Sequence, residues 1–165
     1  MHNEITVRKG IQAALNDNFM NEVTSLARAM NMEPSFNVRE FDGQTMAESL
    51  VAHDDYGKVF TVGRQFEMDG VVGGGSRVKV DYLIVVGVPL GQISYVKKTG
   101  RSSELTDQVS LIVHGLFSVI RKLRTAPNCD ITMGEVSNLM WSADDNIDQD
   151  FIEVHMQITV DVELR

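Results

Sequence analysis

The last fifteen residues of the chain, Phe151 to Arg165, alternate between apolar and polar side chains. The even positions from Ile152 to Leu164 are aliphatic or Met, and the odd positions from Glu153 onward are polar. A period of two predicts one long β-strand with one face on a core and the other in water or against a polar partner. At roughly 3.3 Å per residue this strand would span about 50 Å. We therefore expect it to bend or to overhang its own domain, where it could meet a neighbouring subunit.

Apolar residues spaced three or four positions apart predict a first helix from about Glu4 to Met30. Asn31 and Pro34 end it, because proline lacks the amide proton that a helix needs. We expect frayed or kinked helix at Gly10 and at the run from Asn16 to Asn18. The apolar stripe consists of Ile11, Leu15, Phe19, Val23, Leu26 and Met30.

A second helix is predicted from Ser103 to Thr125, and all of its local signals agree. Ser103 caps it, Glu104 and Asp107 lie in its first turn, and its last turn is basic, as the helix dipole favours. The expected stripe consists of Leu105, Val109, Ile112, Leu116, Ile120 and Leu123, widened by Val113, Phe117 and Val119.

Strand patterns fill much of the remaining chain. Ser35 to Phe41 gives a short strand signal, and Ile131 to Trp141 predicts a strand that pairs with the C-terminal one. Lys58 to Met68 and Arg77 to Val88 both alternate, with Phe60, Val62, Phe66 and Met68 as the apolar set of the first. The glycine-rich segment between them predicts a hairpin with a mobile tip. Leu83 and Val85 add apolar groups to the second face of the later strand, so we expect that strand to be central in its sheet.

The order helix, strand, hairpin, helix, hairpin predicts an α+β fold in a single domain over residues 1–165. We expect a mostly antiparallel sheet of about five strands, with two amphipathic helices packed on one face and a long C-terminal strand.

Composition narrows the classes of function. The formal charge is -8, so a general grip on nucleic-acid phosphates is not expected. The single cysteine, Cys129, excludes an internal disulfide and fits synthesis in a reducing compartment. No apolar run reaches membrane-spanning length, and the N-terminus lacks a signal-peptide pattern. We expect a soluble protein that is not secreted.

The glycine cluster from Gly70 to Gly75 does not have the context of a phosphate-binding loop. It lacks a GK[ST] ending, its spacing does not match G-x-G-x-x-G, and a strand follows it instead of a helix. A hairpin tip that orders itself against a partner is the better interpretation, since glycine allows close approach of the backbone.

The acidic segment from Ser142 to Asp150 resembles a calcium loop only superficially. An EF-hand register starting at Asp144 needs glycine where Gln149 stands and glutamate where His155 stands. We interpret the segment as a solvated hairpin loop, with a weak metal site as the alternative.

Acid–base chemistry has one candidate among the histidines. His53 is followed by Asp54 and Asp55 in a predicted loop, which supplies carboxylates beside an imidazole. His114 lies opposite its apolar stripe, and His155 is as well suited to an intersubunit contact as to catalysis. None of these histidines belongs to a catalytic signature, and the sequence predicts no enzyme activity and no cofactor.

Charge is segregated along the chain. Seven acids and no Lys or Arg lie between Ser142 and Leu164, whereas bases gather around the second helix. Identical subunits with such surfaces can associate head to tail, acidic edge to basic edge, and close into a ring. An ordinary solvated surface is the alternative. The basic positions are Lys97, Lys98, Arg101, Arg121, Lys122 and Arg124.

The glycine-tipped hairpin, the amphipathic helix from Ser103 to Thr125 and the closing alternating strand that ends in Val160, Asp161, Val162, Glu163, Leu164 together resemble the tail terminator (tail completion) proteins of long-tailed bacteriophages. The resemblance covers most of the chain and is one of pattern. It implies a structural virion protein: a homo-oligomeric ring, typically a hexamer, that caps the viral tail tube and serves head-tail joining at the neck. Tail tube proteins and other head-to-tail connectors have related folds and are the first alternative. The second is a small α+β enzyme or ligand-binding domain that uses His53.

The same resemblance implies partners and a location. The partners are copies of the chain, the tail tube protein and a neck or head-completion protein, while DNA passes through the lumen without specific binding. Assembly would take place in the host cytoplasm. By similarity, the candidate interface residues are Gly70, Gly73, Gly74, Gly75, Lys97, Lys98, Arg101, Asp144, Asp145, Asp148 and Asp150.

Overall fold

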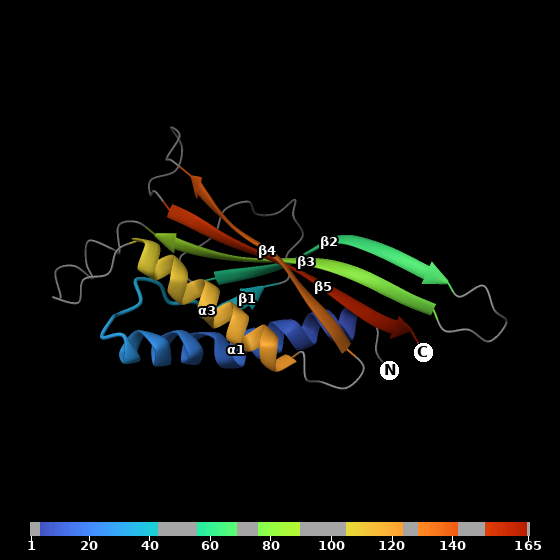
Figure 1. Ribbon diagram of the computed structural model, residues 1–165, viewed down its shortest axis with the longest axis horizontal. Helices are drawn as coiled ribbons and strands as arrows, with labels where there is room; N and C mark the ends of the chain where they lie inside the picture. Colours follow the sequence, from blue (N-terminus) through green and yellow to red (C-terminus); the bar gives the residue numbers. More distant parts are fainter. Residues whose placement is uncertain are drawn as a thin grey trace.

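The computed structural model describes residues 4–42, 56–68, 76–89, 105–123, 129–141 and 151–164. Two helices lie on one side of a twisted sheet (Figure 1). The α+β class and the order helix, strand, hairpin, helix, hairpin are confirmed. The elements are α1 (Glu4–Ala29), β1 (Glu40–Asp42), β2 (Tyr56–Met68), β3 (Ser76–Pro89), α3 (Leu105–Leu123), β4 (Cys129–Trp141) and β5 (Phe151–Leu164).

The sheet is mixed, with strand order β1-β2-β3-β5-β4. β1 pairs parallel with β2, and the other pairs are antiparallel. β3 lies between β2 and β5, and Val85 on its second face is buried, so the prediction that this strand is central is confirmed. β4 pairs with β5 as expected, and places β5 inside the sheet rather than at an edge.

The core lies between the helices and the face of the sheet that carries the even positions of β3 and β5. Pairing in register brings Val80 opposite Val160 and Tyr82 opposite Ile158, so the apolar positions of the two strands coincide on one face. Tyr82 is fully buried there. The alternation predicted for the C-terminal strand is confirmed, because Val154, Met156, Ile158 and Val160 are all fully buried.

A β-bulge in β2 overturns the predicted alternation of that strand. The register with β3 shifts between Thr61 and Gly63, so two residues of β2 pass one position of β3. Phe60 therefore pairs with Leu83 on the outer face, the face away from the helices, whereas Phe66 pairs with Val78 on the helix face. Phe60 is buried, and Phe66 is 66% exposed.

α1 is continuous through the positions where a kink was expected. Asn16 and Asn18 are accommodated because their amides find partners: Asn16 Oδ1 accepts a hydrogen bond from Phe41 N at 2.6 Å, and Asn18 Nδ2 donates to Ala14 O at 3.0 Å. The predicted stripe is confirmed from Ile11 to Val23. After Val23 the observed stripe differs from the prediction, because the spacing of four residues continues to the buried Ala27.

The end of α1 explains why Met30 is exposed instead of buried. Asn31 has a φ of 54°, Met32 N donates to Ala27 O at 2.7 Å, and Asn31 N donates to Arg28 O at 3.2 Å. These are the two bonds of a Schellman motif. The helix thus stops at the predicted place, and Met30 is turned outward with 62% of its surface exposed.

The segment before β1 is mostly irregular, so the strand predicted from Ser35 to Phe41 is too long. Its apolar residues Phe36 and Val38 are buried nevertheless. Gln108 of α3 takes the place of a strand partner: its Oε1 accepts from Ser35 N at 2.7 Å, and its Nε2 donates to Glu33 O at 3.0 Å. The alternation from Ser35 to Phe41 correctly predicted which side chains are buried. It did not predict the backbone hydrogen bonds, which are made with Gln108 of α3 and not with another strand.

The two helices pack tightly against each other at Gly115. A Cβ built on this residue would lie 2.6 Å from Val23 Cγ2 and 2.9 Å from Phe19 Cε2 of α1. Phe117, predicted in the stripe, is 43% exposed because the buried side of α3 is centred on Gly115 and on Gln108, which the apolar pattern could not include.

We expect Gly115→Ala to destabilise the protein, because overpacking a core costs about 1–3 kcal/mol and outweighs the gain of roughly 1 kcal/mol in helix propensity. Gly10→Ala in α1 is the matched control: no atom lies within 4 Å of its added Cβ, so that variant should be more stable than the parent. Urea unfolding of the two variants measures both free energies. A Gly115→Ala protein as stable as Gly10→Ala would contradict the described helix contact.

Gln108→Leu should also destabilise the fold, since it leaves Ser35 N and Glu33 O without their side-chain partner. Each buried backbone group left unpaired costs about 1–3 kcal/mol. Ser110→Ala, on the exposed side of the same helix, should change the free energy of unfolding by less than about 0.5 kcal/mol. Equal losses for the two variants in thermal or urea unfolding would show that Gln108 does not hold this segment.

Candidate functional site

The far end of the β2–β3 hairpin projects past the helices. We call this region the arm and define it as Gly63–Met68 of β2 with Ser76–Asp81 of β3, which pair in antiparallel register. Figure 1 shows the two strands continuing beyond the N-terminal end of α1. On the arm, Gln65, Phe66 and Glu67 are exposed and available to a partner, whereas Val78 and Val80 of β3 are buried in the core.

An ion pair joins the base of the arm to the first turn of α1. Arg64 Nε donates to Glu4 Oε2 at 2.6 Å, and Arg64 Nη2 lies 2.6 Å from Glu4 Oε1, so the contact is bidentate. The hydrogen bond with Glu4 raises the pKa of the Arg64 guanidinium above its ordinary value. Tyr82 Oη adds a longer bond of 3.4 Å to Glu4 O. These contacts link the first turn of α1 to the base of the arm.

Three large apolar side chains lie close in sequence to this ion pair and remain exposed. Ile5 follows Glu4 and is 57% exposed, while Val62 and Phe66 stand two residues on either side of Arg64 and are 43% and 66% exposed. A single exposed apolar residue is ordinary, but several around one anchored point are typical of a contact surface.

The outer face of the arm is polar and carries exposed ion pairs. Lys79 Nζ lies 3.1 Å from Glu67 Oε1, and Arg77 Nε lies 3.2 Å from Asp161 Oδ1 of β5. Such exposed pairs contribute little stability, but they fix the pattern of charge that a partner would meet.

The other end of the outer face is different, because charged groups there are buried. Lys58 and Glu153 are each less than 5% exposed, although the odd positions of β5 were predicted to face water or a polar partner. Lys58 Nζ lies 3.9 Å from Asp42 Oδ2, and His155 Nε2 lies 2.8 Å from Glu153 Oε2. No sequence signal marked these residues as buried, since the pairs join separate strands or alternate positions of one strand.

Both sides of the sheet present open strand edges. Within the described ranges, β1 covers β2 only at Tyr56–Lys58, and no strand pairs with the side of β4 that faces away from β5. An open edge offers unpaired N–H and C=O groups that can pair with another chain. Val59–Met68 of β2 and Cys129–Trp141 of β4 are therefore candidate contact elements.

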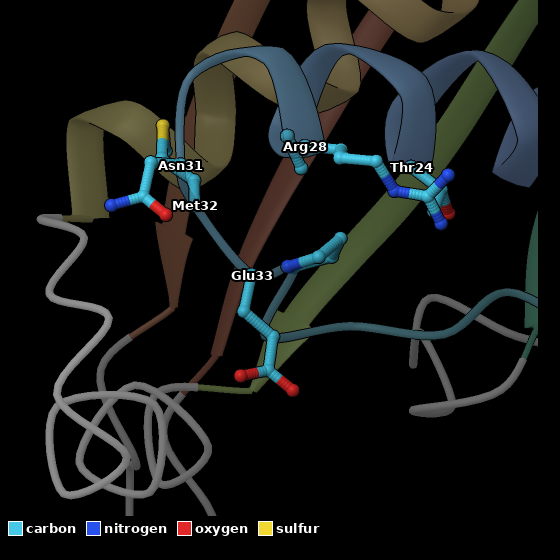
Figure 2. A pocket seen from close by; sticks show the side chains of 7 residues that line it. Thr24, Arg28, Asn31, Met32 and Glu33 are labelled. Carbon is cyan, nitrogen blue, oxygen red and sulfur yellow. The ribbon is translucent and has the colours of Figure 1, made fainter.

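A pocket of about 410 Å³ lies at the C-terminal end of α1. Figure 2 shows its polar side chains spread around it, with the carboxylate of Glu33 pointing away from the guanidinium of Arg28. The polar groups do not converge on one point, as catalysis would need. The pocket is lined by Thr24, Ala27, Arg28, Asn31, Met32, Glu33 and Pro34.

All eleven predicted interface residues lie outside the described residues, and so does the possible catalytic group of His53, Asp54 and Asp55. They remain predictions. His114 is exposed on α3, as expected. In the part of the chain that the structure describes, no three His, Cys, Asp or Glu side chains gather as metal ligands. No described helix is long and apolar enough to span a membrane.

No protein-family model matches the chain, and no curated protein matches it. Functional inference rests on the surfaces described above and on the pattern of the sequence.

The Glu4–Arg64 pair should show a coupling free energy of about 0.2–1 kcal/mol, because it is bidentate but partly exposed to solvent. A double-mutant cycle with Glu4→Gln, Arg64→Gln and the double variant measures it by urea unfolding. The coupling should shrink in about 1 M salt, where charges are screened within roughly 3 Å. The Lys79–Glu67 pair, within the hairpin alone, provides the comparison cycle. Zero coupling at low salt would contradict the anchoring of the arm by this pair.

Proposed function

We propose that this chain is a structural virion protein of the tail terminator type, which assembles into a homo-oligomeric ring that caps the phage tail tube and joins it to the neck. The observation that carries the proposal is the arm, since it extends past the helices, is anchored by the Glu4–Arg64 pair and exposes Phe66. A projecting element that exposes a large aromatic side chain suits contact between subunits better than it suits a free monomer.

The distribution of polar groups supports assembly over catalysis. The charged residues of the arm form exposed pairs along the strands, and those at the other end of the outer face are buried in pairs. An enzyme site would instead collect a few polar groups in an apolar cavity. The described pocket does not have this arrangement.

The overall charge agrees with a conduit for DNA. At -8, each subunit repels phosphates, and a ring of such subunits would let DNA pass without holding it. The proposed partners are further copies of the chain, the tail tube protein and a neck or head-completion protein. The ring, expected to be a hexamer, would form in the host cytoplasm and end in the virion.

The solution mass of the purified chain, measured by light scattering and followed by negative-stain imaging, tests the proposal. We expect a single closed ring, or a monomer that forms one ring only at the ends of tail tubes. Stacking of the purified chain into long tubes would favour a tail tube protein instead. A compact monomer or dimer that ignores tail tubes would overturn the assembly function, and alanine substitutions at His53 and Asp55 would then test for an enzyme.

A further inference from the structure

We propose that neighbouring copies join through their strand edges, with β4 of one copy adding to the open edge of β2 in the next. This inference rests on the proposed ring and names the contact that would build it. Its starting point is that the two open edges lie on opposite sides of the same sheet.

The hydrogen-bonding capacity of the two edges matches. On the side of β2 that faces away from β3, no described strand pairs with Val59–Met68. On the side of β4 that faces away from β5, no described strand pairs with Cys129–Trp141. Strand addition satisfies the outward N–H and C=O groups of both edges at once. Because each copy would use one edge of each kind, every copy can bind two neighbours, and such a head-to-tail contact closes into a ring when the rotation permits.

Charge disfavours the pairing of two β4 edges. β4 carries Asp130 and Glu135 and has no Lys or Arg, whereas the open stretch of β2 from Val59 to Met68 carries one base, Arg64, and one acid, Glu67. Two β4 edges side by side would bring four acids together, and like charges on adjacent strands destabilise a sheet. The open stretch of β2 has no net charge, so a β4 edge meets no such repulsion there.

The exposed apolar residues of β2 give this contact an anchor. Val62 stands at the bulge and Phe66 stands four residues further along the arm, and both are exposed in the single chain. A strand added at this edge would cover their open flanks.

Bulges restrict which strands can fit. β4 also has an irregular register, between Met133 and Val136. A bulge bends its strand and disrupts a regular ladder, so it discourages pairing with arbitrary extended chains. β2 and β4 would pair only in a register that aligns the two bulges.

Hydrogen exchange followed by mass spectrometry tests the contact on the native chain. On assembly, amides of Val59–Met68 and of Cys129–Trp141 should exchange at least tenfold more slowly. Amides of β3, which is already paired on both sides, should change little and serve as the internal control. A ring that forms without added protection in β2 and β4 would overturn this contact and leave the proposed function standing. A chain that neither assembles nor caps tail tubes would overturn both.

A matched pair of variants gives an independent reading. Phe66→Glu places an acid at the edge that would meet the acidic β4, and it should weaken assembly at least tenfold. Phe117→Glu changes the same kind of exposed side chain on α3, which belongs to neither edge strand, and should leave assembly unchanged. Both positions are exposed, so circular dichroism and urea unfolding should show an intact fold. Equal assembly of the two variants, or a stronger defect in Phe117→Glu, would overturn the inference.

Discussion

Phe19, at the middle of α1, is the point through which the parts of the core are joined. Its ring meets Phe41 of β1 edge-to-face, with centroids 5.2 Å apart, and lies 6.4 Å from the ring of Phe36. On another side it lies beneath Gly115, where only the absence of a side chain lets α3 come so close. One fully buried residue thus ties the second helix, the irregular segment and the edge strand to α1. The two helices joined at this point cover only part of the sheet (Figure 1).

That partial cover gives the two ends of the sheet different physical roles. Beneath the helices, the even positions of β3 and β5 supply the apolar burial that stabilises the fold. Beyond Glu4 the same strands continue with less helix above them, and β2 exposes Phe66 on the face that is buried elsewhere. On the outer face, the buried pair of Glu153 and His155 gives way along β5 to the exposed pair of Asp161 and Arg77.

Periodicity predicted the helices and strands well, because the spacing of apolar residues along the sequence determines which face of each element is buried. The C-terminal strand, the central position of β3 and the end of α1 at Asn31 all follow from it. Features that depend on pairing between distant residues could not be predicted in this way. The bulge at Val62 shifts the alternation by one residue; Gly63 beside it is compatible with a bulge, but a glycine in a strand does not by itself fix the register. Gln108 looks like a solvent-facing residue until the segment it bonds is placed beside it.

The candidate site shows the same division. The predicted contacts were glycines, bases and acids of the connecting segments, chosen by composition and resemblance, and they lie outside the described residues. The arm was recognised only in the structure. The contact between Glu4 and Arg64 shows where α1 begins along β2, and the strands continue past that point. Exposure of Phe66 follows from that overhang and from the bulge together, and neither is visible in the sequence.

Because the arm extends past the helices, evolutionary selection acts differently on the residues of the core and on the exposed residues of the arm. Residues under the helices must keep their volume and apolar character, because each change there alters the stability of every copy. Gln65, Phe66 and Glu67 of the arm are exposed and contribute little to that core, so their side chains can be exchanged without unfolding the chain. A lineage could therefore change what the arm binds, one substitution at a time, while the fold that carries the arm stays the same.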